Sequence, residues 1–265
     1  MAYIAGHNVT TMTGEPMSAL NLLAARRTPW LAVASALTTL VMGGLSPAAW
    51  AQTQAPAEPT GSALTTYQVV GQDFRKCAFP FCGGYYVKAV NQALTRCADG
   101  KWATRCHAVT LDTAALGWSV DQQASFNEPW GQGQALVQGQ LALTEVQGVK
   151  ANVLTVSSAW QGQVGKQAKG SVYSVRDTGI RCIVAPCPSL EARLLNSRKA
   201  PFNTELNLSA SGATDEQVAA SGPALGATGV LVAGTVAPTT TSTFDGRTVK
   251  VNQLVATEFY LPAKP

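Results

Sequence analysis

The sequence has little charge, and this limits the classes of protein to which it can belong. Charged side chains make up 13% of the 265 residues, against about 25% in typical soluble domains. We therefore expect a surface built largely from Gln, Ser, Thr and Asn. The formal net charge of +4 is too small for strong non-specific binding of nucleic acid, and no nucleic-acid partner is expected. The 24 glycines and 14 prolines are close to average usage, which excludes collagen-like chains.

Residues and motifs for common catalytic chemistries are also scarce. The chain has two histidines, and only His107 remains once an N-terminal signal is removed. Most acid–base and nucleophile constellations that rely on imidazole are thereby excluded. The sequence contains no G-x-S-x-G, no H-E-x-x-H and no glycine-rich loop ending in Lys-Ser/Thr. We predict that the protein is not an enzyme and has no catalytic, cofactor-binding or metal-binding residue.

Residues 1–51 are typical of a secretory signal peptide. An apolar stretch of about 16 residues follows two arginines and precedes Ala49-Trp50-Ala51, a small-x-small cleavage pattern. The stretch is shorter than the ~20 residues that span a bilayer as a helix, although a retained anchor is the alternative. Met1 and Met17 are both candidate translation starts. We expect a secreted or periplasmic protein with no transmembrane segment after cleavage.

All six cysteines follow the predicted cleavage site, so disulfides are expected in the oxidising compartment. Six cysteines allow fifteen pairings, but an internal repeat narrows the choice. Tyr67-x-Val69 and Tyr173-x-Val175 each precede a basic residue and a C-x4-C motif. Leu136-Val137 and Leu231-Val232 later open a strand-turn-strand unit in each copy.

The second copy contains only one C-x4-C pair, which must close within that copy. Cysteines in the corresponding motif of the first copy should pair likewise, and the remaining two lie in an insertion that the second copy lacks. The crossed pairing of Cys77 with Cys106 and of Cys82 with Cys97 remains the alternative. The favoured bridges are Cys77–Cys82, Cys97–Cys106 and Cys182–Cys187.

Short, partly alternating segments favour β-strands in both copies. Residues 85–90 and 190–195 fit strands with one buried face. Tight turns are expected at Asp99-Gly100, Gln147-Gly148 and Asp245-Gly246.

Helix signals are few. A helix is indicated over 214–220, where Thr214 is a good N-cap, and it should stop before Gly222-Pro223. Residues 119–124 occupy the comparable place in the first copy.

These patterns predict a mostly β, disulfide-bearing protein made of two related modules. Residues 52–66, rich in proline and poor in large apolar groups, form a flexible linker. The first module covers 67–162 and the second 171–262. Each is expected to be a small β-barrel or sandwich with at most one short helix.

The loop Ala78-Phe79-Pro80-Phe81 is the strongest candidate for a functional site. Two phenylalanines in a loop closed by a bridge present an aromatic anchor at low entropic cost. We expect a non-catalytic binding or inhibitor-like module whose partner is another protein or an envelope component; sequence leaves the oligomeric state open. The alternative for the loop is that one or both rings fold back onto the module.

Other functions were weighed against this one. A periplasmic enzyme or a metal or redox protein would use Cys106, His107 and nearby carboxylates, and an envelope structural component is a further alternative. The remaining candidates are carboxylate pairs for a glycosidase and an aromatic platform for sugars. They comprise Asp121 with Glu128, Asp215 with Glu216, and Trp102, Trp118, Trp130, Trp160, Tyr85, Tyr86 and Tyr260.

The cysteine motifs are specific enough to suggest a family. They read Lys76-Cys77-x-x-Pro80-x-Cys82-Gly83-Gly84-Tyr85 and Gly179-Ile180-Arg181-Cys182-x-x-x-Pro186-Cys187-Pro188-Ser189. With them the chain resembles, over nearly all of 67–260, a family of bacterial secreted proteins classed as a domain of unknown function. The resemblance implies an exported, disulfide-bearing protein, and it carries over no functional residue.

Overall fold

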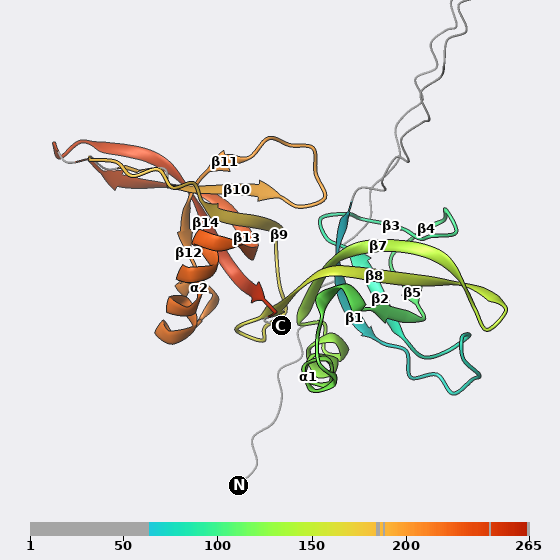
Figure 1. Ribbon diagram of the computed structural model, residues 1–265. Coiled ribbons are helices and arrows are strands. Elements are labelled where there is room, and N and C mark those ends of the chain that lie inside the picture. Colours follow the sequence, from blue (N-terminus) through green and yellow to red (C-terminus); the bar gives the residue numbers. More distant parts are fainter. Residues whose placement is uncertain (1–63, 184–185, 188, 244, 264–265) are drawn as a thin grey trace, which may run out of the picture. The chain divides into compact units, whose positions relative to one another are not determined.

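A computed structural model describes residues 64–183, 186–187, 189–243 and 245–263 (Figure 1). The predicted signal peptide 1–51, both candidate starts and residues 52–63 of the predicted linker lie outside this part of the chain. Strand β1 begins at Thr65, so the last two residues of the linker 52–66 belong to the sheet. Within the described part, no helix is both long and apolar enough to cross a membrane.

Two halves of the described chain contain their elements in the same order. In the first half these are β1 (Thr65–Gln72), β2 (Tyr85–Ala89), β3 (Thr95–Arg96), β4 (Trp102–Ala103), β5 (Cys106–Ala108), β6 (Thr110–Asp112), η1 (Ala114–Leu116), α1 (Val120–Gly131), β7 (Ala135–Val146) and β8 (Val149–Gly162). In the second they are β9 (Ser171–Asp177), β10 (Leu190–Leu194), β11 (Phe202–Asn203), β12 (Glu205–Asn207), η2 (Ser209–Ser211), α2 (Asp215–Ala227), β13 (Val230–Ser242) and β14 (Thr248–Pro262). Strands β3 and β4, which pair with each other, have no counterpart among the described strands of the second half, whereas β5 pairs with β2 as β11 pairs with β10.

The mostly β character is confirmed, but the expected barrels or sandwiches are not found. Twelve of the described strands form one mainly antiparallel sheet with the path β11-β10-β9-β13-β14-β8-β7-β1-β2-β5. The sheet is not closed, because its ends, β11 and β5, do not pair with each other. Instead the halves join where Trp160–Gly162 of β8 pairs with Tyr260–Pro262 of β14. This pairing leaves a continuous sheet in place of two closed modules.

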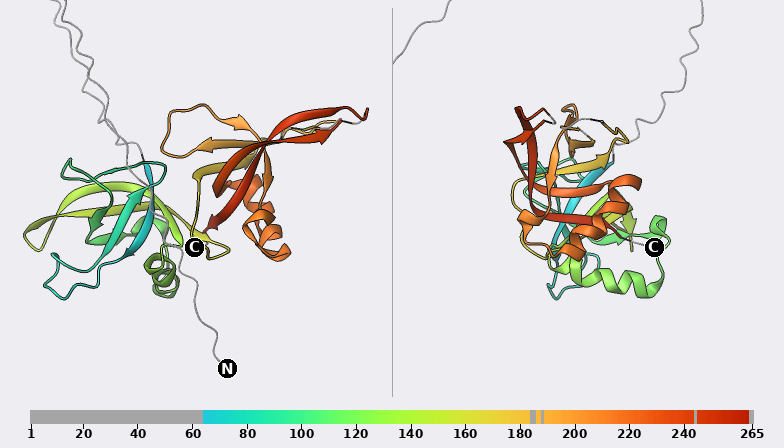
Figure 2. Two further views of the ribbon diagram at one scale, coloured as in Figure 1. Left: turned by 180° about the vertical axis from the view of Figure 1, so that it is seen from behind. Right: turned by 90° about the vertical axis from the view of Figure 1, so that its left-hand side faces the viewer.

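Each half has one α-helix, and both helices begin as their sequences predict. Ser119 and Thr214 are N-caps that form capping boxes with Gln122 and Gln217. The prediction that the second helix stops before Gly222-Pro223 is wrong, because α2 continues to Ala227 with Pro223 inside it. Residues after the proline, Ala224 and Leu225, pack on the core of the second half and so favour the additional turn. In Figures 1 and 2 each helix lies against strands of its own half.

Three hydrophobic clusters hold the sheet together. One lies in the first half around Trp130 and Val69, and a second lies in the second half around Phe259 and Leu254. The third contains residues from both halves, namely Val90, Leu136, Val172, Leu231, Ala233 and Tyr260. Burial of this shared cluster couples the halves, because separating them would expose its apolar surface to water.

Asn196 joins the second half to the first through three hydrogen bonds. Its Oδ1 accepts from the Thr66 backbone N–H at 2.9 Å, and its Nδ2 donates to the carbonyls of Thr66 and Val90 at 2.8 and 2.9 Å. The φ of Asn196 is +51°, a left-handed conformation that asparagine tolerates better than most residues.

Asn91 makes the reciprocal set of bonds. Its Oδ1 accepts from Val172 N–H at 2.8 Å, and its Nδ2 donates to the carbonyls of Val172 and Leu195 at 2.7 and 3.0 Å. Its φ is +59°. Each asparagine side chain thus forms hydrogen bonds with backbone groups of the other half. The two sets of bonds fix how the strands of the two halves meet.

Replacing either asparagine by glycine should isolate the value of these bonds. Asn196→Gly and Asn91→Gly keep the left-handed backbone, yet each removes three hydrogen bonds to backbone groups. The carbonyls of Thr66 and Val172 keep a backbone donor, Val90 N–H and Leu195 N–H respectively. We expect each to lower the free energy of unfolding by about 2 kcal/mol in urea titrations. Gln147→Gly, at φ +50° in the exposed β7–β8 turn, is the matched control and should change it little. Equal losses at Asn196 and Gln147 would contradict the assignment.

Candidate functional site

All six cysteines form disulfides in the structure. The bridges are Cys77–Cys82, Cys97–Cys106 and Cys182–Cys187, the same pairings that the repeat favours over the crossed alternative. Three disulfides are consistent with a protein that matures in an oxidising compartment. Since Cys106 is bonded and buried, it offers no thiol to the alternative enzyme, metal or redox function.

The loop between Cys77 and Cys82 presents aromatic side chains to solvent. Phe79 is 43% exposed and Phe81 62% exposed, and Phe74, just before the loop, is 78% exposed. Pro80 between them is buried. A hydrogen bond of 3.0 Å from Phe81 N–H to the Ala78 carbonyl closes a turn inside the loop. The phenyl rings are therefore partly exposed instead of folded back onto the sheet.

Asp73 and Arg75 form an ion pair at the base of this loop, which is called the Asp73–Arg75 clamp. Both nitrogens Nε and Nη2 of Arg75 bind the Asp73 carboxylate, the closest contact being 2.7 Å. Nη2 also donates to the Phe81 carbonyl at 3.1 Å. The hydrogen bonds from Arg75 lower the pKa of Asp73 to about 2, so this buried carboxylate remains ionised at neutral pH and the clamp persists.

His107 contacts Asp73 of the same clamp. Its Nε2 is 2.6 Å from the Gly83 carbonyl and 3.3 Å from Asp73 Oδ2. Because a carbonyl only accepts, Nε2 must carry a proton in this arrangement. Among the described residues no hydroxyl or thiol is hydrogen-bonded to the His107 ring. The geometry therefore braces the loop and does not form a nucleophile–base pair.

The second C-x4-C loop has a similar clamp. Arg181 binds the Asp177 carboxylate through Nη1 and Nη2 at 2.9 and 2.7 Å, and these bonds lower the pKa of Asp177 to about 2. Ile180 and Ile183 are exposed beside the bridge. Val184 and Ala185 of this loop lie outside the described residues. Each half thus presents an apolar loop tied at its base by an Asp–Arg pair.

The other sequence candidates do not come together. Asp121 and Glu128 lie on α1 and are exposed, whereas Asp215 and Glu216 are exposed in the first turn of α2. Most of the aromatic residues pack in the interior: Tyr85, Trp118 and Trp130 in the first core, and Trp160 and Tyr260 in the shared cluster. Tyr86 stacks beneath Arg105, whose guanidinium carbon is 4.3 Å from the ring centroid. Trp102 is the exception, with 62% of its surface exposed.

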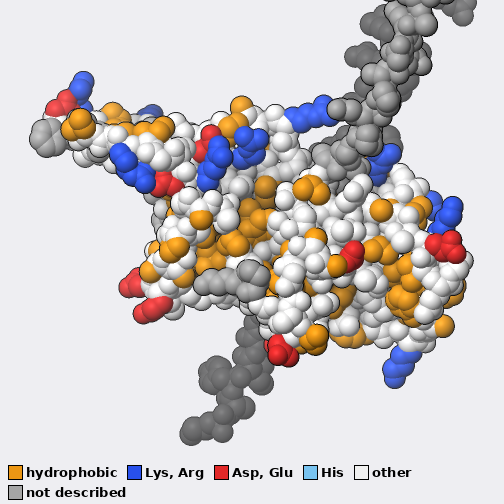
Figure 3. All heavy atoms as spheres, in the orientation of Figure 1, with side chains coloured by type: hydrophobic (Ala, Val, Ile, Leu, Met, Phe, Trp, Pro, Cys, Tyr) orange, Lys and Arg blue, Asp and Glu red, His pale blue; other side chains and the backbone are white. Residues whose placement is uncertain are grey.

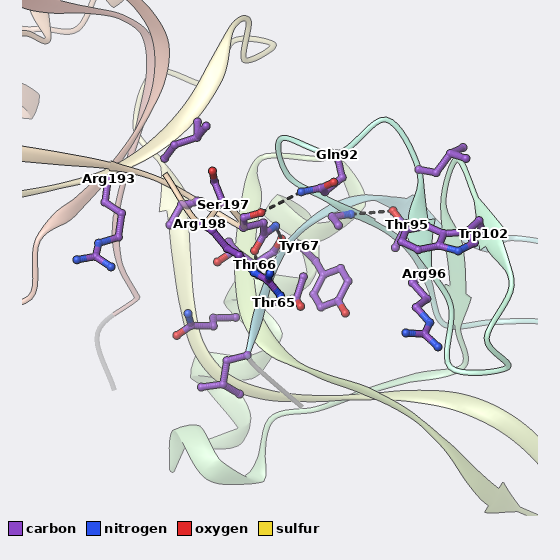
Figure 4. Close-up of a pocket in the computed structure, with 17 residues that line it drawn as sticks. Thr65, Thr66, Tyr67, Gln92, Thr95, Arg96, Trp102, Arg193, Ser197 and Arg198 are labelled. Carbon is purple, nitrogen blue, oxygen red and sulfur yellow. Dashed lines mark hydrogen bonds between the residues drawn. The ribbon is translucent and has the colours of Figure 1, made fainter. Parts of the chain in front are cut away.

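Sequence reasoning missed a cleft of about 520 Å³ that both halves line. Trp102 and Arg96 come from the insertion of the first half, and Arg193 and Arg198 come from β10 and the segment after it (Figure 4). These residues are up to about a hundred positions apart in the chain, and no local pattern joins them. Within the described residues, no group of three or more His, Cys, Asp and Glu side chains is placed to hold a metal ion.

The surface around these features carries little charge. The face shown in Figure 3 is mostly uncharged, with scattered basic and acidic side chains between apolar patches. This agrees with the low charged fraction of the sequence. An isolated group of cations or of exposed aromatic rings is therefore more distinctive here than on an ordinary surface.

Comparison with known proteins identifies the family and nothing more specific. No curated protein and no solved structure matches the chain. A family model does match, over residues 66–265, which is most of the chain. The expectation drawn from the two cysteine motifs is thereby confirmed: the chain belongs to the family described as Domain of unknown function (DUF6748).

Proposed function

We propose that this protein is an exported, non-catalytic binding protein that contacts a protein or envelope partner through the loop 77–82. The observation that carries the proposal is the exposure of Phe79 and Phe81 on a loop closed by Cys77–Cys82. Aromatic side chains contribute most to protein interfaces when they bury in a partner. A loop ordered before binding loses little entropy when it docks.

The Asp73–Arg75 clamp supports docking more than inhibition of a protease. A substrate-like inhibitor loop presents its scissile carbonyl to the oxyanion hole of the protease. The Phe81 carbonyl already accepts a hydrogen bond from Arg75 at 3.1 Å, and the bond after Phe79 leads into Pro80. Neither carbonyl is arranged as such a loop requires, whereas both rings remain free to insert into a pocket.

We also infer that the two halves are copies of one module. The support is the repeated order of elements, the two capping boxes and the reciprocal asparagines. In this interpretation the loop 182–187 is the counterpart of 77–82, and its sequence has Val184 and Pro186 at the positions of Phe79 and Phe81. The aromatic copy would be the one specialised for a partner.

Site-specific photocrosslinking tests the proposed loop. A benzophenone amino acid is placed at Phe79 or Phe81 in the full chain, expressed in cells that export it, and irradiated there. We expect one discrete adduct from both positions. Val120, apolar and 84% exposed on α1, is the matched control position and should give none.

Binding of the partner should also depend on the phenyl rings of Phe79 and Phe81. The double variant Phe79→Ser/Phe81→Ser should fold normally, because both rings are exposed, and should not compete for the partner found by crosslinking. The unchanged chain should compete. Equal adducts at all three positions, or none at 79 and 81, would refute the proposal.

A further inference from the structure

The cleft beside β1 consists of two adjoining hollows. The larger hollow, of about 520 Å³, adjoins another of about 340 Å³. The two share Thr65, Tyr67 and Arg96 in their linings and therefore adjoin each other; together they are called the groove. A groove of this form suits an extended, chain-like ligand better than a compact one.

The arginines that line the groove differ from the other described arginines, because they have no carboxylate or aromatic partner within the described chain. Arg75, Arg176, Arg181 and Arg247 form ion pairs with carboxylates, and Arg105 stacks on Tyr86. In the described ranges, the remaining arginines are Arg96, Arg193 and Arg198; all three are exposed and all three line the larger hollow.

The groove also lacks the opposite charge. No aspartate or glutamate is among the described residues that line either hollow. An anionic ligand in either hollow would therefore meet exposed guanidinium groups with no carboxylate of the lining competing for them. Guanidinium groups bind carboxylates through two parallel hydrogen bonds, which gives such a ligand a preferred orientation.

Trp102 adds a second kind of contact. Its indole is 62% exposed and lies beside Arg96 (Figure 4), and the exposed Leu94 lines the same hollow. An exposed indole offers a flat apolar face on which the face of a sugar ring can pack. Side chains with hydroxyl or amide groups, such as Gln138 and Ser197, also line the hollow and match sugar hydroxyls.

We propose that this groove binds an acidic oligosaccharide, with a sugar ring stacked on Trp102 and carboxylates paired with Arg96, Arg193 and Arg198. A saccharide accounts for both the indole and the cations, whereas an acidic peptide would account for the cations alone. This site is separate from the loop 77–82, and its existence does not depend on the function proposed for that loop.

Binding of short oligouronates to the mature chain tests the proposal. A panel of galacturonate, glucuronate and mannuronate oligomers is titrated by calorimetry and by tryptophan fluorescence, with neutral oligosaccharides of equal length alongside. At least one acidic oligomer should bind and quench or shift the fluorescence, and salt should weaken it. The neutral oligomers should bind far more weakly. Absence of binding across the acidic panel overturns the proposal.

Variants decide whether binding occurs in the groove. Arg96→Gln and Trp102→Ala should each weaken binding about tenfold. Arg247→Gln, an exposed arginine on the β13–β14 hairpin, is the matched control and should bind normally. Phe79→Ser/Phe81→Ser should also bind normally, which separates this test from that of the loop. If oligoglutamate binds equally well and Trp102→Ala has no effect, the groove is a site for acidic peptides and the saccharide proposal is wrong.

Discussion

Replacement of Glu258 by glutamine is expected to lower the free energy of unfolding by about 3 kcal/mol, because its carboxylate accepts four backbone hydrogen bonds. Oε1 accepts from the N–H groups of Gln163, Val164 and Phe259 at 3.1, 3.0 and 2.9 Å. Oε2 accepts from Lys166 N–H at 3.0 Å. The residue is 1% exposed, so water cannot replace these partners.

The charge of Glu258 is compensated by these dipoles alone. Within the described ranges Glu258 forms no ion pair, and Lys166 directs its Nζ to the Ser211 carbonyl at 2.7 Å. Burial, and secondarily the charge of Glu258, raise the pKa of the neighbouring Tyr260 hydroxyl. Glutamine keeps one acceptor oxygen but turns an NH₂ group toward N–H donors, so at least one backbone donor loses its partner.

Urea titration of the oxidised chain measures this loss. Glu145→Gln, an exposed glutamate near the tip of the β7–β8 hairpin, is the matched control and should change stability by less than about 0.5 kcal/mol. Hydrogen exchange should also quicken at the amides of Val164 and Lys166, which join β8 to β9. A loss below about 1 kcal/mol would show that the carboxylate does not organise this connection.

Glu258 marks a limit of what the sequence can predict. In the first half, Ser158 occupies the position in the strand ladder that corresponds to Glu258. A register shift just before Glu258 leaves Thr257 unpaired, and Glu258, Phe259 and Tyr260 are then buried in succession. An alternating strand would have exposed at least one of them. A single carboxylate in a strand carries no local signal of burial.

Features that depend on neighbours in the chain were predicted well. The capping residues Ser119 and Thr214 start their helices, and the expected turn at Gln147-Gly148 has both residues at positive φ. At Asp99-Gly100 and Asp245-Gly246 only the glycines are left-handed. The internal repeat predicted the local disulfide pairing, because the single C-x4-C pair of the second copy indicates how the equivalent pair of the first copy is bonded.

Features that depend on distant segments were not predicted. Pairing of Trp160–Gly162 with Tyr260–Pro262 converts two expected modules into one open sheet, and nothing near either strand indicates it. The groove likewise needs Arg96 and Arg193 on opposite sides, which follows only from the way the halves meet. For the loop 77–82 the sequence indicated a closed loop with two aromatic residues but left open whether the rings are exposed or folded back; in the structure Phe79 and Phe81 are both exposed.

Gly139→Ala and Gly234→Ala are each expected to cost about 3 kcal/mol or more, because a methyl group at either position meets backbone on the paired strand. A Cβ on Gly139 would lie 2.1 Å from the Thr155 carbonyl oxygen, and one on Gly234 would lie 2.2 Å from that of Val255. Both glycines stand where the strand register shifts, at equivalent places in β7 and β13. The obstructing atoms belong to the backbone of the paired strand, which cannot move aside as a flexible side chain could.

A glycine-to-alanine change of opposite sign provides the control. Gly226 lies inside α2, does not precede a proline, and a Cβ built on it meets nothing within 4 Å. Gly226→Ala should therefore stabilise the protein by about 0.5 to 1 kcal/mol, since alanine restricts the unfolded chain and favours helix. A uniform effect of all three substitutions would contradict the steric argument.

The two destabilised variants also test whether the halves unfold together. The β8–β14 pairing, the shared cluster and the reciprocal asparagines connect the halves. Gly139→Ala and Gly234→Ala should therefore each shift one common transition, followed both by tryptophan fluorescence, since all four described tryptophans lie in the first half, and by exchange of amides in β13. If Gly139→Ala moves the first signal and leaves the second unchanged, the halves are independent folding units, and the joined sheet adds little to their stability.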